Sequence, residues 1–98
     1  MKITWNRNAS KSHLEILDFL IFKWNYEIAE NFNDLILQAE RQIIKFPDSG
    51  TPFSKTIRKI ILHKNASLYY EYDENLKTIT ILLFIDNRQN PDAYFKLL

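Results

Sequence analysis

The stretch Phe46-Pro47-Asp48-Ser49-Gly50-Thr51-Pro52 separates two parts of the sequence that have different hydrophobic periods. Before it, apolar residues recur every three or four positions, which is the spacing of an amphipathic helix. After it, apolar and polar residues alternate, which is the spacing of a strand. Two prolines and a glycine within this stretch are typical of a turn that ends one element before another begins. The sequence therefore predicts an α+β fold, with helices first and strands after them.

Two helices are expected before this turn. The first spans about residues 9–23, with Asn8 or Ser10 as its N-cap. The second spans about residues 26–45, and its apolar stripe consists of Ile28, Phe32, Leu35, Ala39, Ile43 and Phe46. Its acidic start and basic end agree with the helix dipole. Only a few residues around Asn25 separate the two helices, so we expect an antiparallel helical hairpin.

Four strands complete the predicted fold. A short strand over residues 2–5 precedes the helices, and three longer strands follow the turn at residues 56–63, 68–73 and 78–85. The gaps between these three have hairpin length, so the strands are expected to pair antiparallel. The last strand is expected to be central because both of its faces are apolar. One face would carry Ile79, Ile81, Leu83 and Ile85, and the other Leu82 and Phe84.

A short helix over residues 92–98 is expected at the end of the chain, because Asn90-Pro91 is a typical start for a helix. The complete prediction is a short N-terminal strand and a two-helix hairpin packed on one face of a small antiparallel sheet, followed by this terminal helix. The opposite face of the sheet is then expected to be a concave working surface.

Composition excludes several classes of function. At 98 residues, with 46% hydrophobic and 26% charged residues, we expect residues 1–98 to form one domain. The absence of cysteine excludes disulfides, thiolate zinc sites and a cysteine nucleophile, and it fits a cytoplasmic protein. A single glycine, Gly50, argues against the glycine-rich loops of nucleotide-binding enzymes, so no cofactor or metal is expected. We recognise neither a signal peptide nor an apolar run long enough to span a membrane, so no membrane partner is expected.

Positive charge is concentrated in the middle of the chain. The formal net charge is +1, but residues 41–64 contain six cations against one acid, while the flanking segments are each acidic by two charges. Such a patch attracts anionic partners such as nucleic acid or an acidic peptide, although lysines that protect a strand edge would give the same pattern. Strand alternation predicts that Arg58 and Lys59 lie on opposite faces of the sheet, with His63 on the side of Lys59. The candidate binding residues are Lys55, Arg58, Lys59, His63, Lys64 and Arg88.

The order of these elements resembles the RelE/ParE family, toxins of bacterial type II toxin–antitoxin modules. The resemblance runs the length of the chain, and its most specific pieces are Phe46–Gly50, Arg58–Leu62, Leu68–Asp73 and Asp86–Pro91. It implies growth arrest, plasmid stabilisation and a cognate antitoxin that wraps around the toxin in a hetero-oligomer. It also implies one of two targets. RelE-like members cut mRNA in the ribosomal A site, whereas ParE-like members inhibit DNA gyrase.

A RelE-like reading assigns catalysis to three residues. A metal-free ribonuclease needs a base, an acid and cations that stabilise the phosphate. The resemblance implies that Arg58, Arg88 and Tyr94 would have these roles. However, Ile60 and Ser67 stand where the family's nucleases have further cations. Because one lost charge-stabilising donor costs about 10²- to 10³-fold in rate, the sequence favours the ParE-like branch, in which toxicity comes from binding gyrase rather than from catalysis.

Simpler explanations remain for these residues. His63 fits an exposed side chain at the end of a strand, and the tyrosines at 69, 70 and 72 fit packing in a half-buried strand. Arg88 follows a buried strand, where a cation is well placed to meet a carboxylate or a phosphate. A non-toxic RNA- or peptide-binding module is the third functional alternative. Under the family reading, the antitoxin is expected to bring an acidic segment with an amphipathic helix, which folds onto the toxin beside the basic strand.

Overall fold

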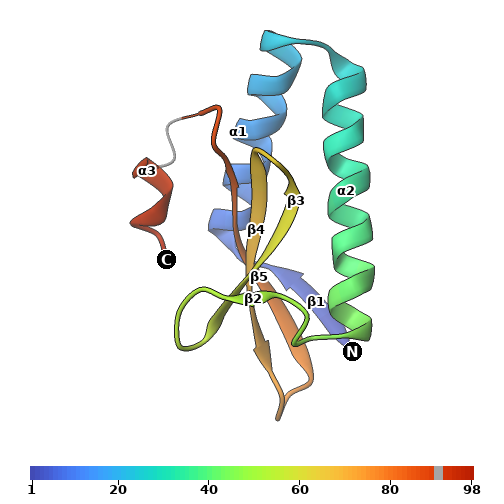
Figure 1. The fold of residues 1–98 in the computed structure, drawn as a ribbon, viewed down its shortest axis with the longest axis vertical. Coiled ribbons are helices and arrows are strands. Elements are labelled where there is room, and N and C mark those ends of the chain that lie inside the picture. The colour runs from blue at the N-terminus through green and yellow to red at the C-terminus, as the bar shows by residue number, and fades with distance from the viewer. Residues whose placement is uncertain (90–91) are drawn as a thin grey trace.

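The computed structural model describes residues 1–89 and 92–98. The elements in chain order are β1 (Lys2–Trp5), α1 (Arg7–Lys23), α2 (Tyr26–Lys45), β2 (Thr51–Pro52), β3 (Ile57–His63), β4 (Ala66–Asp73), β5 (Thr78–Asp86) and α3 (Asp92–Phe95), as Figure 1 shows. The predicted order of elements is confirmed, and the turn segment adds the two-residue strand β2. The predicted helix start at Asn90-Pro91 lies outside the described residues, and α3 ends three residues before the predicted bound at 98.

Each long helix begins at an asparagine cap. The side chain of Asn6 accepts a hydrogen bond from the N–H of the third residue of α1 at 2.8 Å. The predicted caps, Asn8 and Ser10, lie inside the helix because Asn6 satisfies this donor earlier in the chain. Asn25 caps α2 in the same way, and the two helices run side by side as the predicted antiparallel hairpin (Figure 1). None of the described helices is long and apolar enough to cross a membrane.

The described strands form a mixed sheet in the order β1-β5-β4-β3-β2. The pairs β2–β3, β3–β4 and β4–β5 are antiparallel, as predicted, and β5 lies inside the sheet. The prediction of a wholly antiparallel sheet is wrong at one edge, because β1 runs parallel to β5. Hairpins impose the antiparallel direction on strands adjacent in sequence, whereas two helices and three strands separate β1 from β5, so no short turn sets their relative direction. Ile3 pairs with Ile79 in this parallel register.

A β-bulge changes which side chains of β5 face the helices. Tyr69 pairs with Leu83 and Tyr70 pairs with Ile81, so Leu82 is an extra residue in β5. Because one extra residue inverts the alternation of a strand, Phe84 packs with the helix-side core. The predicted single face of Ile79, Ile81, Leu83 and Ile85 is therefore wrong for its last two members. These two pack on the opposite face.

The described buried residues form one hydrophobic cluster on each face of the sheet. The larger cluster lies between the helices and the sheet, and its largest members are Ile16, Leu20, Phe32, Ile43, Leu68, Tyr70, Ile79, Ile81 and Phe84. The smaller cluster on the opposite face contains Ile57, Tyr69, Leu83 and Ile85, with Tyr94 and Leu98 packed against it. The face that was expected to be open is therefore partly covered by the C-terminal segment.

Candidate functional site

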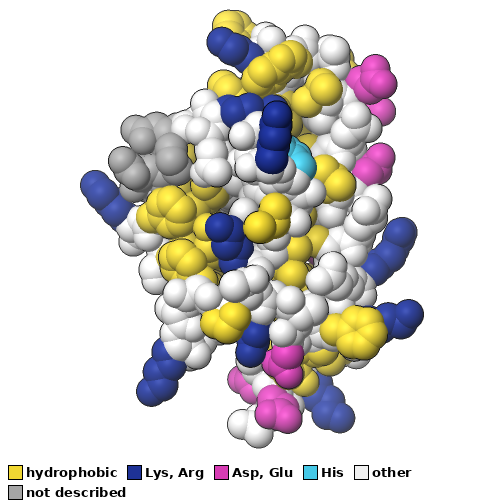
Figure 2. Space-filling model, in the orientation of Figure 1, with side chains coloured by type: hydrophobic (Ala, Val, Ile, Leu, Met, Phe, Trp, Pro, Cys, Tyr) yellow, Lys and Arg dark blue, Asp and Glu magenta, His cyan; other side chains and the backbone are white. Residues whose placement is uncertain are grey.

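The structure does not gather the six candidate binding residues into one site. Lys55 is exposed in the loop between β2 and β3, while Arg58 and His63 lie near opposite ends of β3. They are five positions apart along the strand, which is about 16 Å at 3.3 Å per residue. Figure 2 agrees with this dispersal, because Lys and Arg side chains are scattered over the face in view with apolar side chains between them. The middle of the chain does not form one continuous basic surface on this face.

The prediction that Arg58 and Lys59 lie on opposite faces of the sheet is confirmed, but the predicted side of His63 is wrong. Arg58 pairs with Tyr70 on the helix side, and Lys59 pairs with Tyr69 on the opposite side, as alternation predicts. His63 pairs with Ala66, a member of the helix-side core. The register of β3 shifts between residues 61 and 63, so His63 lies on the side of Arg58 and not on the side of Lys59.

Arg58 holds the turn that follows α2. Its Nη1 donates to the backbone carbonyl of Gly50 at 2.8 Å and to that of Asp48 at 3.1 Å. Its Nη2 lies 3.8 Å from the Asp48 carboxylate. The hydroxyl of Tyr70 completes the arrangement, since it donates to the carbonyl of Pro47 at 2.6 Å and accepts from the N–H of Gly50 at 3.0 Å. These contacts give Arg58 a structural role.

Arg88 is held by a buried carboxylate. Asp86, which is 1% exposed, accepts from Nε of Arg88 at 2.8 Å and from Nη2 at 2.5 Å. It also accepts from the backbone N–H of Arg88 at 2.9 Å. The hydrogen bond to Asp86 raises the pKa of Arg88 above its ordinary value. The guanidinium carbon lies 5.0 Å from the ring centroid of Trp24, a cation–π contact with the end of α1.

His63 contacts this arginine. Its Nδ1 accepts from the backbone N–H of Asn65 at 3.1 Å, and its Nε2 lies 3.4 Å from Nη2 of Arg88. Burial lowers the pKa of His63 below 6.5, and the charges of Arg88 and Lys64 lower it further against the opposing effect of Asp86. This shift favours the neutral form of the imidazole. His63, Lys64 and Arg88 are the three candidate residues that the structure brings together.

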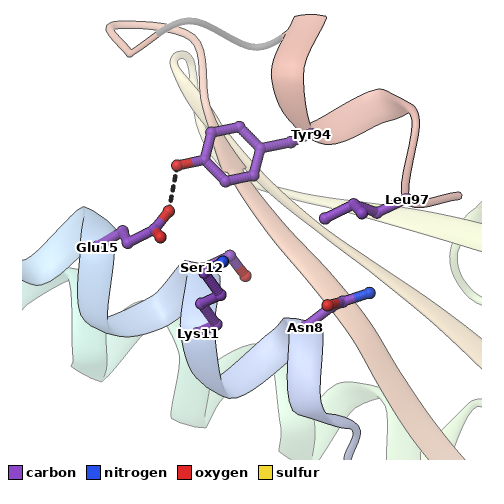
Figure 3. A pocket seen from close by; sticks show the side chains of 6 residues that line it. All are labelled: Asn8, Lys11, Ser12, Glu15, Tyr94 and Leu97. Carbon is purple, nitrogen blue, oxygen red and sulfur yellow. Dashed lines mark hydrogen bonds between the residues drawn. The ribbon is translucent and has the colours of Figure 1, made fainter.

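Tyr94 is engaged elsewhere. Its hydroxyl donates a short hydrogen bond to the carboxylate of Glu15 in α1, as Figure 3 shows. This hydrogen bond, together with burial and the Glu15 charge, raises the pKa of Tyr94 to about 12. The two residues border a pocket of about 290 Å³ between α1 and the C-terminal segment. Its other lining residues are Asn8, Lys11, Ser12 and Leu97.

The sequence analysis missed the two carboxylates that engage the proposed catalytic pair. Asp86 carried a usable signal, because it ends a buried strand two residues before Arg88. Glu15 carried none, since it lies 79 residues from Tyr94 and resembles any acid on a helix surface.

The residues that the resemblance assigns to catalysis are held by other groups in this structure. Arg88 and Tyr94 both bind carboxylates, and a phenol with a pKa of about 12 is a poor proton carrier near neutral pH. Ile60, where the resemblance to RelE-like nucleases implies a cation, is 8% exposed and belongs to the helix-side core. Arg58 is directed toward the turn.

Comparison with known proteins gives a structural match. No family model matches the sequence, and none of the curated proteins matches it significantly. A chain from the solved structure of the chromosomal ParDE TA system from P. aeruginosa superposes with a TM-score of 0.72. The chain has the fold of this ParDE protein. The match covers 88% of this chain and 95% of the ParDE chain at 19% sequence identity, so the two proteins share an architecture while most of their side chains differ.

Proposed function

We propose that this protein is the toxin of a type II toxin–antitoxin module and that it arrests growth by binding DNA gyrase, as ParE-like toxins do. The likeness to a chain of the ParDE toxin–antitoxin system supports the assignment to such a module. The observation that carries the choice of target is the engagement of Arg88 and Tyr94 by Asp86 and Glu15. A RelE-like nuclease would need this pair for phosphate stabilisation and proton transfer.

The face of the sheet opposite the helices has the chemistry expected of a surface that binds the proposed antitoxin. Phe53 and Phe95 are stacked 6.2 Å apart beside Tyr69, on the face opposite the helices, and they are 44% and 39% exposed. Ile61, which is 67% exposed, and the cation Lys59 lie on the same face. An acidic segment with an apolar stripe would cover this face, because it pairs with the cation and removes apolar area from water.

The test of the target is a supercoiling assay with purified gyrase and relaxed plasmid. We expect micromolar protein to block supercoiling, while relaxation of the same plasmid by a topoisomerase I remains unaffected. Normal supercoiling by gyrase in the presence of the folded protein would contradict the proposal.

A parallel assay separates the nuclease alternative from the gyrase proposal. In a translating extract, we expect the reporter message to stay intact when the protein is added. Truncated message that disappears with Arg88→Ala would instead establish the ribosome-dependent nuclease. Expression in a bacterial host is expected to stop growth until the product of the adjacent reading frame is co-expressed, whereas a non-toxic binding module would leave growth unchanged.

A further inference from the structure

The two ring nitrogens of His63 cannot both accept the hydrogen bonds that their contacts with Asn65 and Arg88 would require. The backbone N–H of Asn65 donates to Nδ1, so Nδ1 carries no proton. A neutral imidazole with unprotonated Nδ1 carries its proton on Nε2. Nε2 therefore presents an N–H toward Nη2 of Arg88, which is also a donor, at 3.4 Å. Two donors face each other without an acceptor between them.

We propose that His63 and Arg88, with Lys64 beside them, form a binding site for an oxyanion, either a carboxylate or a phosphate-type group. One oxygen atom that lies about 2.9 Å from each nitrogen would accept from both donors, and this spacing is compatible with nitrogens 3.4 Å apart. The bound oxygen removes the conflict because it is the missing acceptor.

The charges around the two donors favour an anion. Both oxygens of Asp86 already accept from Arg88, so this carboxylate balances one positive charge. Lys64 is exposed in the turn next to His63, and its charge acts on the imidazole. Among the side chains that the structure describes, Lys64 has no carboxylate partner, so its charge is available to a ligand at the surface.

Access to the site is open enough for a small ligand. The Arg88 side chain is 24% exposed, and His63 is half-buried at the end of β3. The contact with Trp24 fixes the guanidinium plane from one side. Asp86 and Trp24 together hold Arg88 in place before the ligand arrives, which reduces the entropy lost on binding.

The experiment follows the imidazole resonances of His63 by NMR while sodium sulfate or sodium acetate replaces sodium chloride at constant ionic strength. Sulfate represents the phosphate-type group and acetate the carboxylate. We expect saturable shifts at His63 and a higher pKa for its imidazole in the presence of the bound anion. His13 is an internal reference, because it lies in α1 with its Nε2 2.7 Å from Oδ1 of Asn33.

Three variants test the assigned residues. Arg88→Gln is expected to weaken anion binding by at least about tenfold, since a charge-assisted hydrogen bond is lost. Lys64→Gln, an exposed change that leaves the fold intact, is expected to weaken it about two- to fivefold. Lys45→Gln is the matched control, because it removes an exposed cation at the end of α2 that lies far from Trp24 and is expected to leave binding unchanged.

The outcomes are distinct. A response to sulfate alone identifies a phosphate-type ligand, a response to acetate alone identifies a carboxylate, and responses to both support a general oxyanion site. The proposal is overturned if neither anion shifts His63 beyond chloride, if His13 shifts in parallel, or if Nδ1 of His63 is found protonated. None of these measurements uses gyrase or an antitoxin, so the result is independent of the proposed function.

Discussion

Asp86 determines the state of the C-terminal arginine, because both of its carboxylate oxygens accept hydrogen bonds from Arg88. The carboxylate of Glu15 likewise accepts a hydrogen bond from Tyr94, and backbone carbonyls of the turn after α2 accept hydrogen bonds from Arg58. At the scale of single residues, then, each side chain that looked catalytic in the sequence already has a partner within the chain. Tyr94 would have to exchange that partner before it could act on a substrate, whereas Nη2 of Arg88 also faces Nε2 of His63 without an acceptor.

Removal of Arg88 is expected to destabilise the protein. In Arg88→Ala, the buried carboxylate of Asp86 loses its charged partner, and we expect the free energy of unfolding to fall by about 2 kcal/mol. Chemical denaturation at pH 7 measures this difference. Arg41→Ala, an exposed change on α2, is the control and is expected to stay within about 0.5 kcal/mol of the wild type. Equal stability of the two variants would contradict the structural role of the Asp86–Arg88 pair.

The hydrogen bond of Tyr94 predicts a titration at high pH. The neutral hydroxyl donates to Glu15 and the phenolate cannot, so folding favours the protonated form. Because the pKa in the folded protein is about 12 and the ordinary value is 10, this contribution to stability is complete below pH 10 and is lost as the pH rises toward 12. Burial also raises the pKa of Tyr69, so ultraviolet absorbance of tyrosinate is expected to show late transitions, of which the one near pH 12 moves to lower pH in Glu15→Gln. Tyr94→Phe is expected to remove that transition, and its persistence there would assign it to another tyrosine.

At the scale of elements, the connections between helices and strands determine where side chains point. The bulge at Leu82 in β5 directs Phe84 toward the helices, where it meets Trp5 at a ring-centroid distance of 4.9 Å. The register shift in β3 directs His63 toward Arg88. Each irregularity adds one residue to one strand, and each therefore changes the surface that the following residues reach.

The turn after α2 requires a glycine at position 50 because there is no space for a Cβ atom there. A Cβ at Gly50 would lie 2.7 Å from the Tyr70 ring and 3.0 Å from Cβ of Arg58. Tyr70 is fully buried and cannot move aside cheaply. Gly50→Ala is therefore expected to lower the free energy of unfolding by about 1–3 kcal/mol in chemical denaturation. Ser49→Ala, one residue earlier and exposed, is the control, and a similar loss there would show that the turn is sensitive for another reason.

At the scale of the whole molecule, the sheet separates a large core under the helices from a smaller one under the C-terminal segment. The strands β4 and β5 contribute to both cores and have a neighbour on each side. The edge strand β2 has only two residues, and both are exposed. Protection from solvent therefore decreases from the middle of the sheet toward β2.

Hydrogen exchange measured by NMR tests this gradient. Backbone amides of β4 and β5 are expected to exchange most slowly, because they open only when the whole domain unfolds. Amides near β2 are expected to exchange much faster. Comparable protection in β2 and β5 would contradict the sheet order and its two cores.

The sequence was sufficient for the local features of this fold. The change of hydrophobic period at residues 46–52 located the helical hairpin and the strands, since a helix and a strand must each present one apolar face at its own spacing. Hairpin-length gaps identified the antiparallel pairs for the same local reason. The direction of β1, the two bulges and the cover over the second core came only from the tertiary structure.

The candidate site was less predictable than the fold. Its residue types were visible in the sequence, and His63, Lys64 and Arg88 do lie together. The interaction partners of the candidate residues could not be predicted from the sequence. Glu15 is 79 residues from Tyr94, and Trp24, which contacts Arg88, lies in the connection between α1 and α2. The amino-acid sequence by itself determined which elements form, because period and turn chemistry act between near neighbours. Only the tertiary structure decided which charges are neutralised, because that depends on distances between residues far apart in the chain.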